Sequence, residues 1–141
     1  MSEAGSWNAR IVEEFRANNG QVGGAFEGAP LVLLHHRGRT SGKDYIAPVM
    51  YLAGEQGRMY VFASKAGAPD NPDWYYNLTA ARAATAELGT ETVELRVTEI
   101  EGDERARVFA QQVERYPGFG EYEAKTRGIR VIPVLALDRA G

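Results

Sequence analysis

Short apolar stretches separated by turn residues run through most of the chain and predict more strands than helices. Residues 31–36 form an apolar run between Pro30 and Gly38, which is typical of a buried strand. Residues 91–100 alternate between apolar and polar side chains, so we expect one face of that strand to meet water. The pattern also predicts strands at residues 44–52, 58–64, 85–88 and 131–137, which makes about six in all.

Helical spacing of apolar residues marks the N-terminal region. Trp7, Ile11 and Phe15 fall on one face of a helix predicted at about residues 6–19, with Ser6 as its cap. Such a helix most often packs on its own core, but a place at a membrane surface or over the active site stays open. Residues 1–5 are predicted to be disordered, 21–29 to be a flexible connector anchored by Phe26, and 71–82 (capped by Asn71), 103–116 and 119–126 to be helices.

The order of the predicted elements defines the fold class. The strands follow one another in meander-like order, with helices inserted and no βαβ repeat, which favours a mainly β fold over a doubly wound sheet. We therefore predict a six-stranded antiparallel β-barrel with accessory helices. The 141 residues contain no internal repeat or linker, so a single domain over residues 1–141 is the simplest interpretation.

Composition excludes several functions. The net charge of −3 makes nucleic acid an unexpected partner, and the lack of cysteine excludes disulfides and thiolate chemistry. His35 and His36 are neighbours on a predicted strand and should point to opposite faces, so no metal site is expected. No apolar run approaches the roughly 20 residues that span a bilayer, and the first residues do not resemble a signal peptide. We expect a cytoplasmic protein, with peripheral membrane contact left open.

A cluster of cations between the first two predicted strands stands out against this acidic background. Arg37, Arg39 and Lys43 supply positive charge, and the glycines Gly38 and Gly42 allow a sharp turn that exposes backbone N–H groups. Such a turn suits a phosphate or carboxylate, although a solvated hairpin turn has a similar composition. A second cation, Lys65, follows in a Gly/Pro-rich loop before a run of aromatic residues, so a planar polyanionic ligand would satisfy both stretches.

Hydrolytic chemistry finds no support in the sequence. The nucleophile motif Gly-x-Ser-x-Gly is absent, and neither Ser41 nor Ser64 has an evident base partner. A redox enzyme fits better, because its cofactor carries the chemistry and the protein supplies binding and orientation.

Two motifs together resemble a known family. The pattern Gly-Arg-Thr-Ser-Gly-Lys, four residues, Pro, and then Ala-Ser-Lys-x-Gly-x-Pro-x-Asn-Pro-x-Trp-x-x-Asn-Leu resembles the deazaflavin-dependent nitroreductases, and the likeness extends from about Trp7 to Leu137. These proteins are small split β-barrels that bind reduced coenzyme F420. The resemblance implies a split β-barrel that passes a hydride from C5 of the reduced deazaflavin to a quinone, nitro compound or other conjugated acceptor.

The resemblance also implies roles for individual residues. The phosphate, with the polyglutamate tail as a further candidate ligand, would be held by Arg39, Thr40, Ser41, Gly42 and Lys43. The deazaflavin would lie against Pro48 and Val49, its polar edge or phosphate would meet Ala63, Ser64, Lys65, Ala66 and Gly67, and that loop would be shaped by Asn71, Trp74 and Asn77.

The acceptor pocket is implied in the same way. Its lining would include Tyr51, Ser64, Tyr116 and Tyr122, with the two last-named tyrosines and Phe119 on one helical face. Phe119 departs from the tyrosine of the family pattern and cannot donate a hydrogen bond. An aromatic stripe of this kind can also be plain core. Two alternatives remain at this point, namely an FMN-dependent split-barrel oxidoreductase and a non-catalytic F420 carrier.

Overall fold

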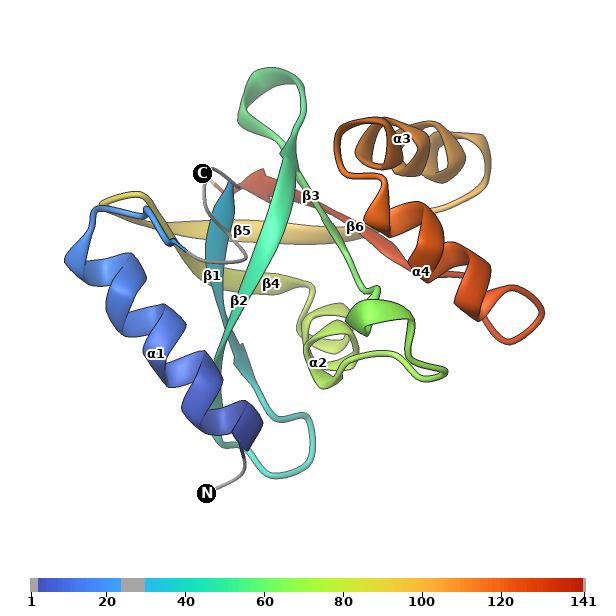
Figure 1. Ribbon diagram of the computed structural model, residues 1–141. Helices are drawn as coiled ribbons and strands as arrows, with labels where there is room; N and C mark the ends of the chain where they lie inside the picture. The colour runs from blue at the N-terminus through green and yellow to red at the C-terminus, as the bar shows by residue number, and fades with distance from the viewer. Residues whose placement is uncertain (1–2, 24–29, 141) are drawn as a thin grey trace.

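The computed structural model describes residues 3–23 and 30–140 and contains a closed barrel of six antiparallel strands (Figure 1). Around the barrel the strands follow the order β1-β2-β3-β6-β5-β4. This arrangement confirms the predicted mainly β, antiparallel barrel. The strands are β1 (Leu31–Arg37), β2 (Asp44–Ala53), β3 (Met59–Phe62), β4 (Ala83–Leu88), β5 (Glu91–Ile100) and β6 (Val134–Arg139).

The helices lie on three sides of the barrel (Figure 1). Helix α1 (Glu3–Ala17) runs beside β1 and β2, α2 (Asp73–Ala81) lies at one end, and α3 (Gly102–Arg115) and α4 (Gly118–Thr126) lie on the side of β6. Two short 3-10 turns, η2 (Glu55–Gly57) and η3 (Lys65–Gly67), follow β2 and β3. No helix in residues 3–23 or 30–140 is long and apolar enough to cross a membrane.

Alternation along the strands divides the core into an inner and two outer clusters. On β1, Val32 and Leu34 point into the barrel, where Leu78 of α2 joins them. Leu31 and Leu33 point outward and are covered by Phe15 of α1. Because both faces of β1 are buried, its sequence reads as a continuous apolar run. The second outer cluster packs beneath α3 and α4 and includes Phe62, Val108, Phe109 and Val134.

The first helix begins earlier than predicted. It starts at Glu3, so residues 3–5 are helical and Ser6 lies inside the helix, where it cannot be the cap. Asn19 and Gly20 follow the helix with positive φ values of 56° and 94°, which agrees with their predicted role in ending it. Phe26 and the rest of the predicted connector at 24–29 lie outside the described residues.

Proline sets several other boundaries. Pro72, not Asn71, is the N-cap of α2, and β6 begins only after Pro133. The predicted Asn71 cap is therefore wrong. Pro48 pairs with Leu33 of β1, whereas β3 pairs with β2 only from Tyr51 onward. Pro48 thus lies where β2 has a single neighbouring strand, as expected for a residue without an N–H.

Candidate functional site

A cleft of about 1280 Å³ opens between α1, the β1–β2 turn and α2. Several residues that the sequence assigned to the cofactor line it, namely Arg39, Thr40, Ser41, Trp74 and Asn77. From α1 it receives Ala9, Val12, Glu13, Arg16 and Ala17. Helix α1 therefore packs on the core through Phe15 and also forms one wall of the cleft.

The β1–β2 turn, residues 38–43, is closed by its own backbone. Gly38 N–H donates to the Lys43 carbonyl at 2.8 Å, and Gly42 N–H donates to the Gly38 carbonyl at 2.9 Å. Gly42 has φ +72°, the left-handed conformation that glycine adopts without strain. We call this segment the first loop.

Asn77 fixes Arg39 within the first loop. The backbone N–H and Nη1 of Arg39 donate to Asn77 Oδ1 at 3.1 and 3.0 Å, and Asn77 is only 4% exposed. The guanidinium carbon also lies 4.9 Å from the centre of the Tyr76 ring. Among the described residues no carboxylate lies within ion-pair distance of Arg39. An amide thus orients this cation without neutralising it.

The amide of Asn77 also determines the protonation state of His36. Because Asn77 Oδ1 accepts from Arg39, Asn77 Nδ2 is the donor to His36 Nδ1 at 2.9 Å. His36 Nδ1 must therefore be unprotonated, which makes the ring neutral. Burial lowers the pKa of His36 in agreement with this, against the opposing field of Asp73. His36 lines the cleft, and the sequence offered no signal for that place beyond a strand-end histidine.

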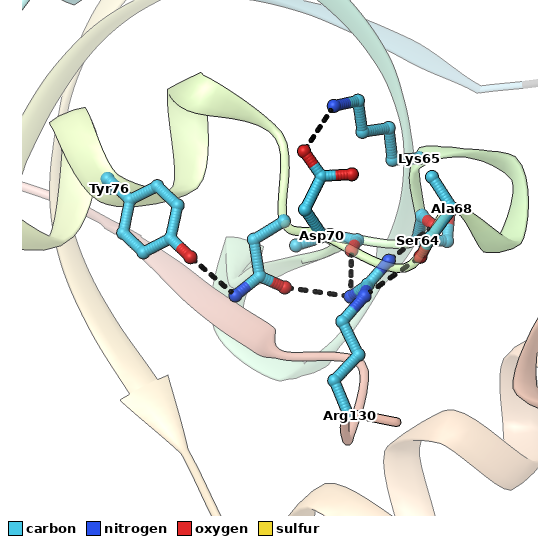
Figure 2. Close-up of polar contacts among 8 residues, drawn as sticks. Ser64, Lys65, Ala68, Asp70, Tyr76 and Arg130 are labelled. Carbon is cyan, nitrogen blue, oxygen red and sulfur yellow. Dashed lines mark hydrogen bonds and ion pairs between the residues drawn. The ribbon is translucent and has the colours of Figure 1, made fainter. Parts of the chain in front are cut away.

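The second loop, residues 63–71, follows β3. Lys65 has φ +47° and Gly67 has φ +82°, so a non-glycine residue occupies the left-handed region. Lys65 Nζ lies 3.1 Å from Asp70 Oδ2 (Figure 2), and this contact lowers the pKa of the Asp70 carboxyl. At the start of this loop, Ala63 is fully buried and Ser64 is 8% exposed.

Arg130 reaches the second loop from the segment between α4 and β6 (Figure 2). Its guanidinium donates to three backbone carbonyls and to Asn71 Oδ1, which lies 2.7 Å from Nη1. Asn71 Nδ2 in turn donates to Tyr76 Oη at 3.2 Å. No pattern in the sequence marks Arg130, because it stands about 60 residues from the loop and lies in neither motif.

The predicted acceptor residues lie apart from the cleft. Phe119 and Tyr122 of α4 pack against the outer cluster, with Phe119 stacked edge-on against Phe62 at a centroid distance of 5.7 Å. Tyr116 is the non-helical C-cap of α3, so the predicted single helical stripe of three aromatics is wrong for Tyr116. Tyr51 packs against the barrel interior.

Helix α4 nevertheless rests on the second loop. A Cβ added to Gly67 would lie 3.3 Å from the Cα of Tyr122 and 2.8 Å from Lys125 Cδ. Together with the φ of +82° at Gly67, this close approach of loop and helix favours glycine at position 67. Some residues predicted for the cofactor do not line the cleft. Among those whose side chains the structure describes, these are Gly42, Lys43, Pro48, Val49, Ala63, Ser64, Lys65, Gly67 and Asn71.

Comparison with known proteins identifies the class. Residues 7–138 match the family described as F420H(2)-dependent quinone reductase. Rv3178 of Mycobacterium tuberculosis, whose name places it among these reductases, is 35% identical over 108 residues, covering 77% of this chain and 88% of the relative. Rv1261c of the same organism, an F420H(2)-dependent quinone reductase, is 27% identical over 127 residues, covering 89% and 85%.

Solved structures agree with this match. The F420-H2 dependent reductase FDR-A is 35% identical with a TM-score of 0.67, covering 77% of this chain and 94% of that one. A structure described as a domain-swapped dimer is 31% identical with a TM-score of 0.69, covering 94% and 96%. The fold and the matches define an oxidoreductase of the split-barrel class that depends on reduced F420. The chain belongs to the F420H2-dependent quinone reductase family, which confirms the predicted enzyme class and cofactor.

Proposed function

We propose that this protein transfers a hydride from reduced F420 to a quinone and binds the cofactor phosphate at the first loop. The observation that carries this proposal is the Arg39 guanidinium, held at the cleft by Asn77 and the Tyr76 ring with no carboxylate partner in residues 3–23 and 30–140. A fixed, unneutralised cation beside backbone N–H groups suits a phosphate.

The remaining residues fit a long anionic cofactor. The hydroxyls of Thr40 and Ser41 and the ammonium of Lys43 supply further donors around Arg39, and Gly42 shapes the turn that carries them. Pro48 and Val49 lie where β2 lacks a second neighbour, a suitable surface for a flat ring. In the proposal Ala63, Ser64, Lys65, Ala66 and Gly67 meet the polar edge or phosphate of the cofactor, and Asn71, Trp74 and Asn77 shape that region.

The bound deazaflavin would supply the hydride, which carries two electrons and one hydrogen to the quinone, and one further proton from solvent or a side chain would complete the hydroquinone. In a quinone the negative charge develops on oxygen, so a nearby hydroxyl donor would stabilise the transition state. We assign this role to Tyr122 first, with Ser64, Tyr51 and Tyr116 as further candidates. Nitro compounds and other conjugated molecules form the wider class of acceptors to test.

Absorbance titration with F420 and with FMN tests the cofactor. We expect tighter binding of F420, with an affinity that falls as salt rises, because several opposite charges meet. Submicromolar FMN binding without detectable F420 binding would contradict the proposal.

Steady-state oxidation of reduced F420 with menadione tests the reaction. We expect turnover that saturates with both substrates. Tight F420 binding without turnover against a panel of quinones and nitro compounds would indicate a carrier in place of an enzyme.

A further inference from the structure

The guanidinium of Arg130 uses all three of its nitrogen atoms on one segment. Nε donates to the Ala68 carbonyl at 3.0 Å, and Nη2 donates to the Ser64 carbonyl at 2.8 Å. Nη1 donates to the Ala63 carbonyl at 3.0 Å and to Asn71 Oδ1 at 2.7 Å. The planar fork thus joins both ends of the second loop (Figure 2).

The loop between these contacts is strained. Lys65 has φ +47°, a conformation that its Cβ disfavours, and Gly67 follows at φ +82°. Inside the loop, Gly67 N–H donates to Ser64 O at 2.9 Å, and Ala68 N–H donates to Lys65 O at 3.0 Å. A strained backbone persists only where its surroundings over-determine it. Here Arg130 holds the Ser64 carbonyl, which belongs to the peptide that enters Lys65.

Within the residues that the structure describes, Arg130 forms no ion pair. In the described part of the chain no carboxylate lies within ion-pair distance of it, and Asp70 is occupied by Lys65 at 3.1 Å. Its partners are neutral carbonyl and amide oxygens. Partial burial accordingly lowers the pKa of Arg130, with Asp70 acting in the opposite direction. A cation behind the loop adds to the positive potential in front of it.

We propose that Arg130 is a positioning residue for the cofactor: its fork holds residues 63–71 in the strained conformation that presents Lys65 to the bound anion. This inference rests on the proposed function. The effect extends to the first loop, because Asn71 donates to Tyr76, whose ring lies beneath Arg39.

Arg130→Lys is the main test, since it keeps a cation and most of the stem but cannot make four bonds in one plane. We expect faster hydrogen exchange at the Gly67 and Ala68 amides in the free protein. We also expect F420 affinity to fall at least tenfold, whereas kcat at saturating F420 changes less. Arg130→Met should weaken binding further, because it removes the charge as well.

Arg105 offers a matched control. Its Nε and Nη2 both donate to the Ile132 carbonyl, at 3.1 and 2.9 Å, and it is partly buried like Arg130. Arg105→Lys should lower the melting temperature without altering exchange at Gly67 and Ala68 or the affinity for F420. A purely structural role for Arg130 would make the two variants alike, and that result would overturn the proposal.

Two further outcomes separate the explanations. If Arg130→Lys binds F420 as tightly as the wild type and only Arg130→Met binds it more weakly, the charge alone matters and the positioning role is wrong. If the wild-type protein binds no F420, the proposed function fails. The exchange rates of the loop amides then still show whether Arg130 holds the loop.

Discussion

The two loops that flank α2 each present a cation, but they hold it in different ways. In the first loop Arg39 is fixed by Asn77, which is buried, neutral and part of the sequence motif itself. In the second loop Lys65 stands on a strained backbone held by Arg130 and pairs with Asp70. The first cation is free to meet an anion, whereas the second must leave a carboxylate to do so.

This difference separates the residues that meet a ligand from the residues that position them. An amide serves as a support for Arg39 because it orients the guanidinium without cancelling its charge. In the second loop the support comes through backbone carbonyls, which any sequence can supply. We therefore expect changes at the first loop to act through charge and changes at the second loop to act through conformation as well.

The largest effect is expected for Lys65→Ala. Loss of a charge-assisted hydrogen bond to the cofactor costs roughly 1.5–3 kcal/mol, so F420 affinity should fall by about ten- to a hundredfold. Stability should change little, because the Lys65–Asp70 pair is exposed. Absorbance titration and thermal melts measure the two quantities. Arg139→Ala, which removes another exposed and paired cation outside both loops, is the control; equal affinities in both variants would place Lys65 in solvent.

Asn77→Asp tests the first loop in a complementary way. The carboxylate can keep both contacts to Arg39, but it neutralises that cation, so we expect about a tenfold loss of F420 affinity, or about 1.4 kcal/mol. A carboxylate beside Nδ1 also favours the charged imidazole, so the pKa of His36 should rise from its lowered value. NMR titration of His36 measures this shift, and unchanged cofactor affinity would refute the role of a neutral support.

Tyr122→Phe asks whether α4, which rests on the second loop, also serves the acceptor. If the Tyr122 hydroxyl donates to the acceptor oxygen, kcat/KM should fall about tenfold, a loss of roughly 1.4 kcal/mol, with F420 affinity little changed. Phe119→Ala is the structural control, because Phe119 packs against Phe62. It should cost about 3 kcal/mol of stability. A stability loss in both variants with unchanged kinetics would make α4 plain core.

The sequence predicted the barrel and the motif residues because their signals are local. Strand β1 is a continuous apolar run because both of its faces are buried, and β5 alternates between apolar and polar residues because only one face is buried. It could not predict Arg130, because hydrogen bonds to backbone carbonyls require no fixed spacing or partner residue. It also placed Tyr116 on one helical face with Phe119 and Tyr122, because a spacing of three residues gives a common face only on helical backbone, and Tyr116 is not helical.

An ion pair that joins α1 to β4 beside the cleft should make the stability of the fold depend on pH. Arg16 and His35 both bond to Glu87 at 2.7 Å, and the hydrogen bond from Arg16 is the main reason that the pKa of Glu87 falls to about 2. A depressed carboxyl pKa stabilises the fold above the unfolded value near 4.5, and this stabilisation is lost as pH falls from there toward 2.

Because Arg16 is half exposed, we expect the ionised Glu87 to contribute about 1–2 kcal/mol to the free energy of unfolding. Urea unfolding of the wild type and Glu87→Gln at pH 6 and pH 3 measures it. The wild type should lose its advantage at the lower pH, and a constant difference between the two proteins would contradict the assignment.

The smallest effect concerns Tyr76, the residue that touches both loops. Its hydroxyl accepts from Asn71 Nδ2 at 3.2 Å, and its ring lies 4.9 Å from the Arg39 guanidinium carbon. Tyr76→Phe removes only the hydroxyl contact, which is exposed, so F420 affinity should fall about twofold. Tyr76→Leu also removes the cation–π contact, which is worth about 0.5–1 kcal/mol at an exposed site. In this variant the F420 affinity should fall about fivefold.

The relative F420 affinities of these two variants show which of the two loops Tyr76 supports. If Tyr76→Phe and Tyr76→Leu weaken F420 binding equally, the hydrogen bond to Asn71 carries the whole effect, and Tyr76 serves the second loop alone. If Tyr76→Phe binds F420 as the wild type does and only Tyr76→Leu is impaired, Tyr76 serves Arg39 alone. We expect the affinity of Tyr76→Phe to lie between those of the wild type and Tyr76→Leu if α2 couples the loops, because each contact then contributes separately to the affinity.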